Sequence, residues 1–598
     1  MSHLSTRSHR CNEPSADQAG QSVVLHGWAH QIRNKSQVIF IVLRDRSGQI
    51  QITIDESCPK EIFETASKVR FEYTLEVKGT VRLRAPEAVN PQMETGDVEI
   101  LVEELTILSG TKPLPFNISD KGPSISEEIR LKYRYLDLRQ SNLQRNLKIR
   151  HQAALATRNY LDSIGFYEIE TPILNRSTPE GARDYLVPSR VHPGMWYALP
   201  QSPQIFKQIL MIGGMDRYFQ ICKCFRDEDL RADRQPEFTQ IDIEMSFVTQ
   251  DQIIDMANGL VREIWKRCIN VDVGEIPVLT YAQVIERFGV DNPDLRFGME
   301  LFTLNAQQSE FVVLQRAFDA GGIARGIVVK DGADSSRKTI DKNYTEFVKK
   351  YRLGGLLWGK VTQADEGLTW KGPLSKVEPE LLSTIPNVEA GDLVLLGAGP
   401  ANHVNTAIGR LRRHIALERN LPEKEYAFCW VTEFPAFDYD EETDIWHAVH
   451  HPFTKPIDDH LEWLGTDKMG DILSDAYDIV CNGYEIGGGS IRIHDSTVQK
   501  QIFDALGLSE EEAKEKFGFL IEALQYGAPP HGGLAMGFDR WIMLLAKTDN
   551  IRDVIAFPKT TKAQDLMAEA PNRVAQDQLL ELSVQNIDNR PNPEGLQD

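Results

Sequence analysis

The chain lacks any uninterrupted apolar stretch long enough to cross a bilayer. Its first residues, Met1 to Gly20, are polar and contain no apolar segment, so they do not form a secretory signal. We expect them to be a partly ordered leader into the first strand. Hydrophobic and charged residues make up 41% and 26% of the sequence, which is ordinary for a protein that folds in water. The sequence therefore predicts no membrane association and a cytoplasmic location.

Cysteine is scarce, with seven residues in a chain of 598, and only Cys222 and Cys224 lie close together. Two residues apart on a strand-like run, their side chains point to one face. No second pair lies at a spacing that completes a zinc site. The sequence therefore favours reduced core thiols in a cytosolic protein over a metal centre.

Positive charge is also scarce, since 66 basic residues face 87 acidic ones and give a net charge of −21. Charge alone favours a protein that avoids nucleic acid. Binding depends on local fields rather than on totals, however, so motifs can overrule this argument. A nucleic-acid partner would require local basic patches, and its affinity would fall with added salt.

A chain of 598 residues is too long for one core, and its N-terminal part has a strand pattern. Five strand-like runs lie between Gln21 and Leu108, and a short helix over Lys60–Arg70 separates the third run from the fourth. This order fits an OB-fold barrel, a fold that binds single-stranded nucleic acid on exposed aromatic residues. We assign residues 1–110 to this domain.

The remaining domains follow from changes of pattern along the chain. Residues 111–140 contain a Pro-, Ser- and Gly-bearing hinge. A helix with an apolar face then ends at Gly165, and a strand carrying Pro172 is expected over Phe166–Leu174. We assign 141–297 to a catalytic domain, 298–425 to an α+β insertion, and 426–598 to the rest of the catalytic domain with a C-terminal extension.

Two charged runs carry the chemistry. One is Phe225-Arg226-Asp227-Glu228, followed by Phe238, and the other is Gly537-Phe538-Asp539-Arg540 at the start of a predicted helix. One arginine can take the α-phosphate of ATP, the phenylalanine can stack on adenine, and the second arginine can take the distal phosphates. An isolated Arg-x-Glu is usually a surface ion pair. The complete set favours a nucleotide site over that alternative.

These two runs resemble motifs 2 and 3 of the class II aminoacyl-tRNA synthetases. The surrounding residues resemble the bacterial-type aspartyl-tRNA synthetases over nearly the whole chain. The resemblance implies an α+β multidomain fold with an N-terminal OB-fold β-barrel, a class II antiparallel-sheet catalytic domain with helices, and an inserted α+β domain of the GAD-like type. The helix and strand ending near Pro172 resemble motif 1, which implies a homodimer; an ordinary helix–strand packing unit is the alternative.

The implied activity is that of a ligase in protein biosynthesis. The α-carboxylate of L-aspartate attacks the α-phosphorus of ATP, which gives aspartyl-adenylate and pyrophosphate. A 3′ hydroxyl of tRNA(Asp) then takes the aspartyl group, and the sequence leaves open whether tRNA(Asn) is also charged. This chemistry needs two anions held in line and the developing charge neutralised, rather than a protein nucleophile.

The resemblance assigns catalytic roles to Arg226, Glu485 and Arg540. The ATP-binding residues that it implies are Arg226, Asp227, Glu228, Gln235, Phe238, Glu485, Gly537, Phe538, Asp539 and Arg540. It also places Mg²⁺ on Asp478 and Glu485, because this ion prefers carboxylate and phosphate oxygens. Their spacing of seven does not put them on one strand face, so a bend near Asn482-Gly483 must bring them together. Solvated acids are the alternative.

The implied aspartate-binding residues are Glu180, Gln204, Lys207, Arg226, Asp242, His450 and Arg492. Arg492 follows three glycines and can grip a carboxylate with both ends of its guanidinium, while Lys207 adds a second positive charge. An asparagine-specific relative would need less positive charge here, so the pair favours aspartate. The His450-His451 pair could instead be a metal site or a plain loop, and we rank substrate contact first.

The implied anticodon contacts lie on the barrel: Arg33, Phe40, Gln51 and Glu99. Phe40 would stack the central base and Gln51 would read its edge. Phe40 lies in the unbroken apolar run Val38–Leu43, so a core position is the alternative. The family often has three arginines and an aspartate before this strand, whereas this chain has Gln31-Ile32-Arg33-Asn34. This departure leaves the choice between the aspartate and asparagine tRNAs open.

Two further classes of protein compete with the ligase. A catalytically silent, synthetase-like RNA-binding protein would be expected to have lost Arg226, Glu485, Arg492 or Arg540, and all four are present. An adenylate-forming enzyme that makes a small amide without tRNA would not need the N-terminal barrel.

Overall fold

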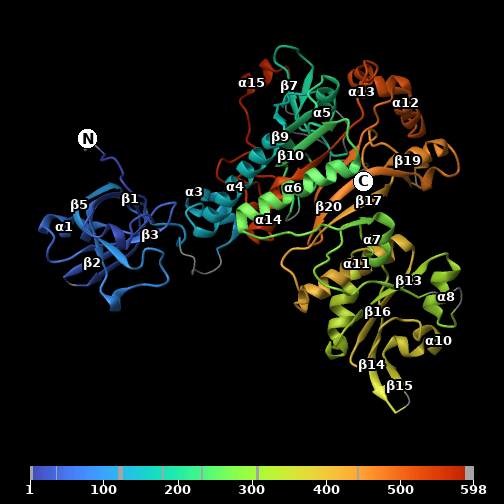
Figure 1. Cartoon of the computed structure of the whole chain (residues 1–598), viewed down its shortest axis with the longest axis horizontal. Helices are drawn as coiled ribbons and strands as arrows, with labels where there is room; N and C mark the ends of the chain where they lie inside the picture. The colour runs from blue at the N-terminus through green and yellow to red at the C-terminus, as the bar shows by residue number, and fades with distance from the viewer. Residues whose placement is uncertain are drawn as a thin grey trace. The chain divides into compact units, whose positions relative to one another are not determined.

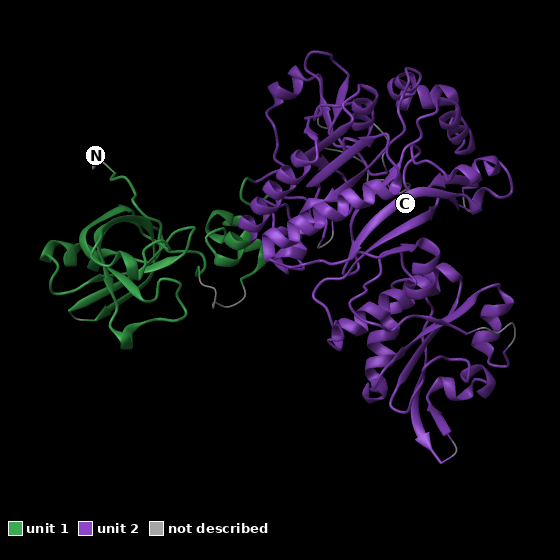
Figure 2. Cartoon of the chain, viewed as in Figure 1, with its two compact units in different colours: residues 1–145, 565–568 green, residues 146–564, 569–598 purple. Residues whose placement is uncertain are grey.

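The computed structural model describes residues 4–35, 37–118, 125–177, 181–230, 233–304, 309–365, 367–440 and 443–585. The chain forms two units, which Figure 2 shows in green and purple. The first comprises residues 1–145 and 565–568, and the second comprises 146–564 and 569–598. The five-part division expected from the sequence remains a prediction. No helix within the described residues is both long and apolar enough to span a membrane.

The first unit contains a closed barrel of five strands, labelled in Figure 1. They pair in the order β1-β2-β3-β5-β4 and are β1 (Ser22–Lys35), β2 (Val38–Arg44), β3 (Gln49–Ile54), β4 (Thr74–Leu83) and β5 (Val98–Ser109). Helix α1 (Lys60–Lys68) lies between β3 and β4 in sequence, as predicted. The other helical segments of the unit are η1 (Ala16–Gln18), η2 (Pro86–Ala88), α2 (Glu127–Lys132) and α3 (Arg134–Asp137).

Side-chain alternation decides which face of each barrel strand is buried. Ile39, Ile41 and Leu43 of β2 belong to the barrel core. Phe40 is only partly buried and is not part of that core, so its ring lies on the opposite, outer face. The sequence alone could not predict the face on which Phe40 lies, because the residues of β2 from Val38 to Leu43 are all apolar.

The second unit is built on an eight-stranded sheet in the order β11-β17-β20-β21-β22-β10-β9-β6. The strands are β11 (Val278–Thr280), β17 (Phe428–Pro435), β20 (Leu473–Cys481), β21 (Tyr484–Ile491), β22 (His531–Gly537), β10 (Glu237–Ser246), β9 (Arg217–Phe225) and β6 (Tyr167–Glu168). Neighbouring strands run antiparallel, except for the outer pairs β11–β17 and β6–β9. The sheet confirms the predicted class II fold.

Three helices cover one face of this sheet: α4 (Ser141–Ser163), α6 (Gln250–Ile269) and α14 (Phe538–Ala546). Their apolar residues join those of the sheet in one core, in which Trp265, Trp430 and Trp541 are fully buried. Helix α14 begins at Phe538, so the helix predicted after Gly537 is confirmed. Helix α5 (Gln204–Ile212) contacts β9 and β10 and supplies polar side chains to β10.

The strand predicted over Phe166–Leu174 is mostly wrong, because only Tyr167–Glu168 pairs, with β9. Pro172 has no N–H to donate to a ladder, which is consistent with the early end of this edge strand. Beyond this short strand, the side chains of Ile173 and Leu174 are exposed. The segment is therefore an irregular, partly apolar edge.

Residues 302–418 form an inserted five-stranded sheet in the order β12-β13-β16-β14-β15. The strands are β12 (Phe302–Thr303), β13 (Ile323–Val329), β14 (Leu357–Ala364), β15 (Gly367–Lys371) and β16 (Leu393–Gly399). Its helical segments are α8 (Val312–Asp319), η3 (Gly332–Asp334), the π-helix η4 (Thr339–Tyr344), α9 (Thr345–Lys349), η5 (Pro373–Lys376), α10 (Pro379–Leu382) and α11 (Ala401–Glu418). Separate cores on its two faces make this a three-layer α+β domain.

The remaining elements surround the large sheet. They are β7 (Leu186–Pro188) with β8 (Trp196–Ala198), β18 (Phe437–Asp440) with β19 (Ile445–Ala448), and the helical segments α7 (Tyr281–Phe288), η6 (Asp458–Trp463), η7 (Met469–Asp471), α12 (Ser496–Ala505), α13 (Glu510–Leu524), η8 (Ile551–Asp553) and α15 (Gln576–Glu581).

Arg412 of α11 anchors the entry to the inserted domain. Its guanidinium is buried and lies over the rings of Phe288 and Phe297, at 4.9 and 4.2 Å. It donates hydrogen bonds of 2.8–3.1 Å to the carbonyl oxygens of four residues of one segment, Asp294, Phe297, Gly298 and Met299. Burial lowers the pKa of Arg412 to about 10. One side chain therefore supplies hydrogen bonds to four backbone carbonyl oxygens of this connection.

We expect Arg412→Leu to destabilise the chain by roughly 3–5 kcal/mol, because four carbonyl oxygens lose their donor in a buried place. Thermal denaturation measures the effect. Arg410→Leu, on the same helix but only partly buried, is the matched control and should change the midpoint little. Equal midpoints for the two variants would show that the buried contacts do not hold the connection.

Candidate active site

A cavity of about 200 Å³ lies where the two charged motifs meet. The loop between β9 and β10 supplies one side, and the end of β22 with the start of α14 supplies the other. Eight of the ten predicted ATP-binding residues line it: Arg226, Glu228, Gln235, Phe238, Glu485, Gly537, Asp539 and Arg540. Two runs that are about 300 residues apart in sequence are thus brought to one site, since β10 pairs with both β9 and β22.

Arg226 and Phe238 face each other across this loop. The guanidinium carbon of Arg226 lies 5.1 Å from the centre of the Phe238 ring. The Nε of Arg226 is buried and has no hydrogen-bond partner among the described residues. A buried donor without a partner indicates a place for an anion, and the adjacent ring offers an aromatic face.

Arg540 reaches the cavity from the first turn of α14. Its Nη1 donates to the backbone oxygen of Glu485 at 2.8 Å, and its Nη2 lies 3.1 Å from Asp233. A Cβ at Gly537 would meet nothing nearer than Arg540 Cδ at 3.9 Å, so a side chain there would project beside the arginine. Arg540 is therefore a fixed cation opposite the Arg226 side of the cavity.

Two residues of the second motif, Phe538 and Asp539, stabilise the structure around the cavity. Asp539 is buried, accepts the backbone N–H of Thr239 at 2.7 Å and pairs with Arg150 of α4. Phe538 lies in the hydrophobic core, beneath Arg150, and does not line the cavity. The pair ties the start of α14 to β10 and α4, which positions Arg540.

Two residues of the first motif are also held by protein partners. The amide of Gln235 accepts the N–H of Lys559 at 2.8 Å and donates to its carbonyl at 3.0 Å. Asp227 does not line the cavity, and its half-exposed carboxylate lies 3.8 Å from Arg183. Gln235 thus docks the chain after α14 onto the cavity loop.

A second cluster of charge lies further along β10, on the same strand face as Gln240 of the cavity. Arg492, directly after β21, is buried and contacts both oxygens of Glu244 at 2.9 and 3.2 Å. It also donates to Ser490 at 2.7 Å and lies 2.9 Å from Nε2 of His451. A bidentate, fully desolvated guanidinium is the geometry suited to carboxylate recognition.

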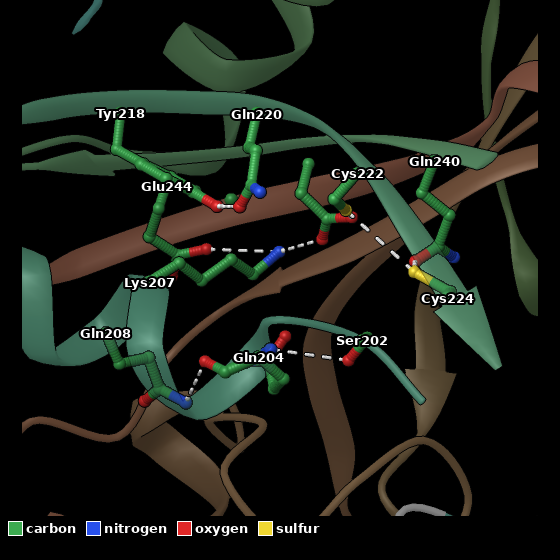
Figure 3. Close-up of polar contacts among 12 residues, drawn as sticks. Ser202, Gln204, Lys207, Gln208, Tyr218, Gln220, Cys222, Cys224, Gln240 and Glu244 are labelled. Atoms are coloured by element: carbon green, nitrogen blue, oxygen red, sulfur yellow. Dashed lines mark hydrogen bonds and ion pairs between the residues drawn. The ribbon is translucent and has the colours of Figure 1, made fainter. Parts of the chain in front are cut away.

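Lys207 of α5 joins this cluster, as Figure 3 shows for Lys207 and Glu244. Its ammonium lies 3.1 Å from Asp242 and 3.5 Å from Glu244, and all three side chains are buried. Burial opposes ionisation of Glu244, but Arg492 and then Lys207 outweigh it and hold its pKa below the usual value. Glu244 therefore stays ionised and holds two cations together.

Glu244 is a residue that the sequence analysis missed. The available signal was its position two residues after Asp242 in a strand, which puts both carboxylates on one face. His451 is the other omission. The prediction chose His450, but the structure places His450 Nε2 4.0 Å from Asp478 and its ring against Phe434, while His451 lies on Arg492.

Gln204 lies three residues before Lys207 on α5 and is nearly buried. Its amide nitrogen has no hydrogen-bond partner among the described residues, so it retains a donor for a ligand. Glu180, predicted to bind the α-ammonium group, lies outside the described residues.

The predicted metal ligands lie on the hairpin of β20 and β21. Asn482 and Gly483 have φ of 55° and 79° and form the turn, so the predicted bend is confirmed. Asp478 pairs in register with Gly488, where a Cβ would lie 2.3 Å from the carboxylate oxygen. Burial, and then the charge of Glu485, raise the pKa of Asp478 well above its usual value. Two neighbouring carboxylates whose negative charge is not fully neutralised by nearby cations are suitable ligands for a divalent ion that prefers oxygen.

The predicted anticodon residues share the outer face of the barrel. Arg33 donates to Gln51 at 3.2 Å, and Gln51 donates to Glu99 at 2.8 Å. Phe40 pairs in register with Arg33 on the neighbouring strand. Arg82 also pairs with Glu99 at 2.7 Å. A ring beside a connected polar row is an arrangement that can stack one base and hydrogen-bond its edge.

Family models match both parts of the chain. The model described as tRNA synthetases class II (D, K and N) matches residues 126–561, and an OB-fold nucleic acid binding domain matches residues 23–108. The chain therefore belongs to the class II tRNA synthetases.

Full-length relatives narrow the assignment within that class. An aspartate–tRNA ligase of Macrococcus caseolyticus is 50% identical over 596 residues, which cover 98% of this chain and 100% of that protein. An aspartate–tRNA(Asp/Asn) ligase of Caldanaerobacter subterraneus subsp. tengcongensis is 51% identical over 587 residues, covering 97% and 98%. Within its class, the chain belongs to the aspartate–tRNA ligase family.

Solved structures support the fold. The asparaginyl-tRNA synthetase from Pyrococcus horikoshii, complexed with asparaginyl-adenylate, is 19% identical and has a TM-score of 0.60 over 93% of this chain and 99% of that chain. At this identity the likeness concerns the fold alone.

His450 makes the stability of the folded chain depend on pH. Burial, and then the charge of Arg492, lower its pKa to about 4. The unfolded chain binds this proton near its ordinary pKa of about 6.5, so stability falls as the pH drops from about 6.5 to about 4, by up to about 3 kcal/mol.

We therefore expect His450→Gln to have a smaller difference in melting temperature than the wild type between about pH 7.5 and about pH 5. Thermal denaturation at both pH values measures it. His447→Gln, an exposed histidine of the same segment, should behave as the wild type. An unchanged pH dependence in His450→Gln would contradict the neutral state of this partly buried ring.

Proposed function

We propose that the chain activates L-aspartate with ATP to aspartyl-adenylate and transfers the aspartyl group to the 3′ end of tRNA(Asp). The observation that carries the proposal is the pair Arg492 and Lys207, held by Glu244 beside the cavity of the two motifs. Alternate residues of one face of β10, Gln240, Asp242 and Glu244, lead from the cavity to that pair.

The cavity residues would bind ATP. Phe238 would stack on adenine, and Glu228 would accept its amino group. Arg226 would neutralise charge at the α-phosphate, and Arg540 would meet the distal phosphates. The unpartnered Nε of Arg226 and the fixed position of Arg540 support these roles. The reaction then depends on holding the two anions in line.

The carboxylate cluster would select aspartate. Arg492 and Lys207 present two buried cations, while Gln204 keeps an unused amide donor. The negative side chain of aspartate is attracted by these two cations. The neutral amide of asparagine gains no such attraction, so its binding would not offset the cost of removing the amide from water. Asp242 orients Lys207, and we assign Glu180 and His450 to the remaining substrate contacts.

Asp478 and Glu485 would hold Mg²⁺ with the phosphates of ATP. The mutual repulsion of these acids supports the assignment. Mg²⁺ supplies charge neutralisation at the phosphates when it is bound. The protein's own part is to fix both carboxylates on the two strands of the β20–β21 hairpin.

We further propose a homodimer, joined through the segment that resembles motif 1, and a cytoplasmic location. Exposed apolar side chains at Tyr167, Ile173 and Leu174 support the interface, since they are 66%, 52% and 54% exposed. All seven cysteines are free, which agrees with a reducing compartment. Sedimentation of the full chain tests the dimer.

A second acceptor, tRNA(Asn), is favoured by one observation. A relative named aspartate–tRNA(Asp/Asn) ligase is 51% identical to this chain, as similar as one named aspartate–tRNA ligase, which is 50% identical. Charging of purified tRNA(Asp) and tRNA(Asn) by the same preparation distinguishes the two specificities.

We expect Arg226→Ala to abolish aspartate-dependent exchange of pyrophosphate into ATP, with a loss of at least about 10²-fold, because the α-phosphate loses its counter-charge. The matched control is Lys223→Ala, which removes an exposed cation from β9, the strand that ends just before Arg226. Near-normal exchange in Arg226→Ala would refute the role of this residue.

We expect Gln51→Ala to reduce tRNA charging by about tenfold and to leave tRNA-free pyrophosphate exchange unchanged, because it removes a base contact from the barrel. Gln21→Ala, at an exposed glutamine before β1, is the control. An equal loss in both assays would argue against an anticodon role for this face.

A further inference from the structure

Two thiols and one carboxylate meet inside the large sheet of the second unit. Cys222 and Cys224 lie on β9, and Asp242 lies on the neighbouring β10. One ligand atom from each lies within 4.8 Å of the others, and all three side chains are buried. Figure 3 shows the two thiols turned toward each other from one strand. The third ligand comes from another strand, so the spacing of the cysteines in sequence could not show the group.

Two of the three separations between the ligand atoms are close to the edges of a tetrahedral metal site. The two sulfur atoms are 3.9 Å apart, and Sγ of Cys222 is 3.3 Å from Oδ2 of Asp242. Zinc binds sulfur at about 2.3 Å and carboxylate oxygen at about 2.1 Å, which places tetrahedral ligand atoms about 3.5–3.8 Å apart. The third separation, between Sγ of Cys224 and the Asp242 carboxylate, lies within 4.8 Å, so closing the site on an ion needs at most about 1 Å of further movement. The amide oxygen of Gln240, 3.1 Å from Sγ of Cys224, is available as a fourth ligand.

The charge balance selects a divalent ion. The donor atoms are those of two thiols and one carboxylate, and all three side chains are buried. A divalent cation that displaces both thiol protons to solvent forms two metal–sulfur bonds and leaves the net charge at −1. With both sulfur atoms deprotonated, a monovalent ion would instead leave a net charge of −2 in the same buried place, which is less favourable.

The thiol ligands exclude Mg²⁺, the ion proposed for the phosphate site. Mg²⁺ requires oxygen ligands in octahedral geometry and does not bind thiolates well, whereas thiolates favour zinc-like ions. Oδ1 of Asp242 remains on Lys207, because the cluster uses the other oxygen. The cluster is therefore separate from Asp478 and Glu485.

We propose that Cys222, Cys224 and Asp242 form a binding site for a thiophilic divalent cation such as Zn²⁺. The site goes beyond the proposed aminoacylation, and its presence does not depend on that activity. It lies next to the carboxylate-binding cluster through the shared Asp242.

The first test is equilibrium dialysis of the chelator-stripped full chain against Zn²⁺, followed by determination of the bound metal. We expect Cys222→Val and Cys224→Val each to bind about one equivalent less than the wild type. The matched control is Cys429→Val, a buried strand cysteine of β17, which should bind as the wild type does. An unchanged zinc content in Cys222→Val, with a wild-type melting temperature, would overturn the proposal.

The second test uses the unaltered chain, so it does not depend on any variant folding. Titration with Co²⁺ should give a thiolate-to-cobalt charge-transfer band and release about two protons per ion in weak buffer. Absence of that band in the wild type would also overturn the proposal. Pyrophosphate exchange, measured separately, reports on the proposed function, so failure of either idea is recognised independently.

Discussion

The buried carboxylate of Glu244 is the group that holds Arg492 and Lys207 together in one charge cluster. It contacts Arg492 with both oxygens and lies 3.5 Å from Lys207. Alone, each of these charges would pay a large desolvation cost in the interior. Together they remain ionised, and two cations stay close enough to act on one short ligand. Without Glu244, the like charges of Arg492 and Lys207 would repel each other in a medium that screens poorly.

Strand alternation places this chemistry where it is needed. Ile241, Ile243 and Met245 of β10 point into the core beneath the covering helices. Asp242 and Glu244, between them, face the opposite side. The packing of the core therefore fixes the positions of the acids, and a shift of one residue in register would exchange the two sets. The stability of the second unit and the geometry of its site rest on the same strand.

The sequence predicted what local pattern and motif can encode. The barrel order, the helix after Gly537 and the turn at Asn482-Gly483 follow from neighbouring residues. The face of Phe40 does not, because both faces of β2 carry apolar residues and only the closed barrel separates them. Glu244 escaped notice since its partner Arg492 lies 248 residues away.

Asp242 connects the lysine of the charge cluster with the cysteines of β9, two features that the sequence analysis considered separately. One oxygen accepts from Lys207 and the other accepts from the thiol of Cys222. A carboxylate with a donor on each oxygen is fixed in rotation, so the thiol helps to hold the lysine in place. Replacing the thiol proton by a metal ion would preserve this orientation, because the same oxygen would remain engaged. A metal ion at the two thiols is therefore compatible with the proposed contact of Lys207 and Arg492 with the substrate carboxylate.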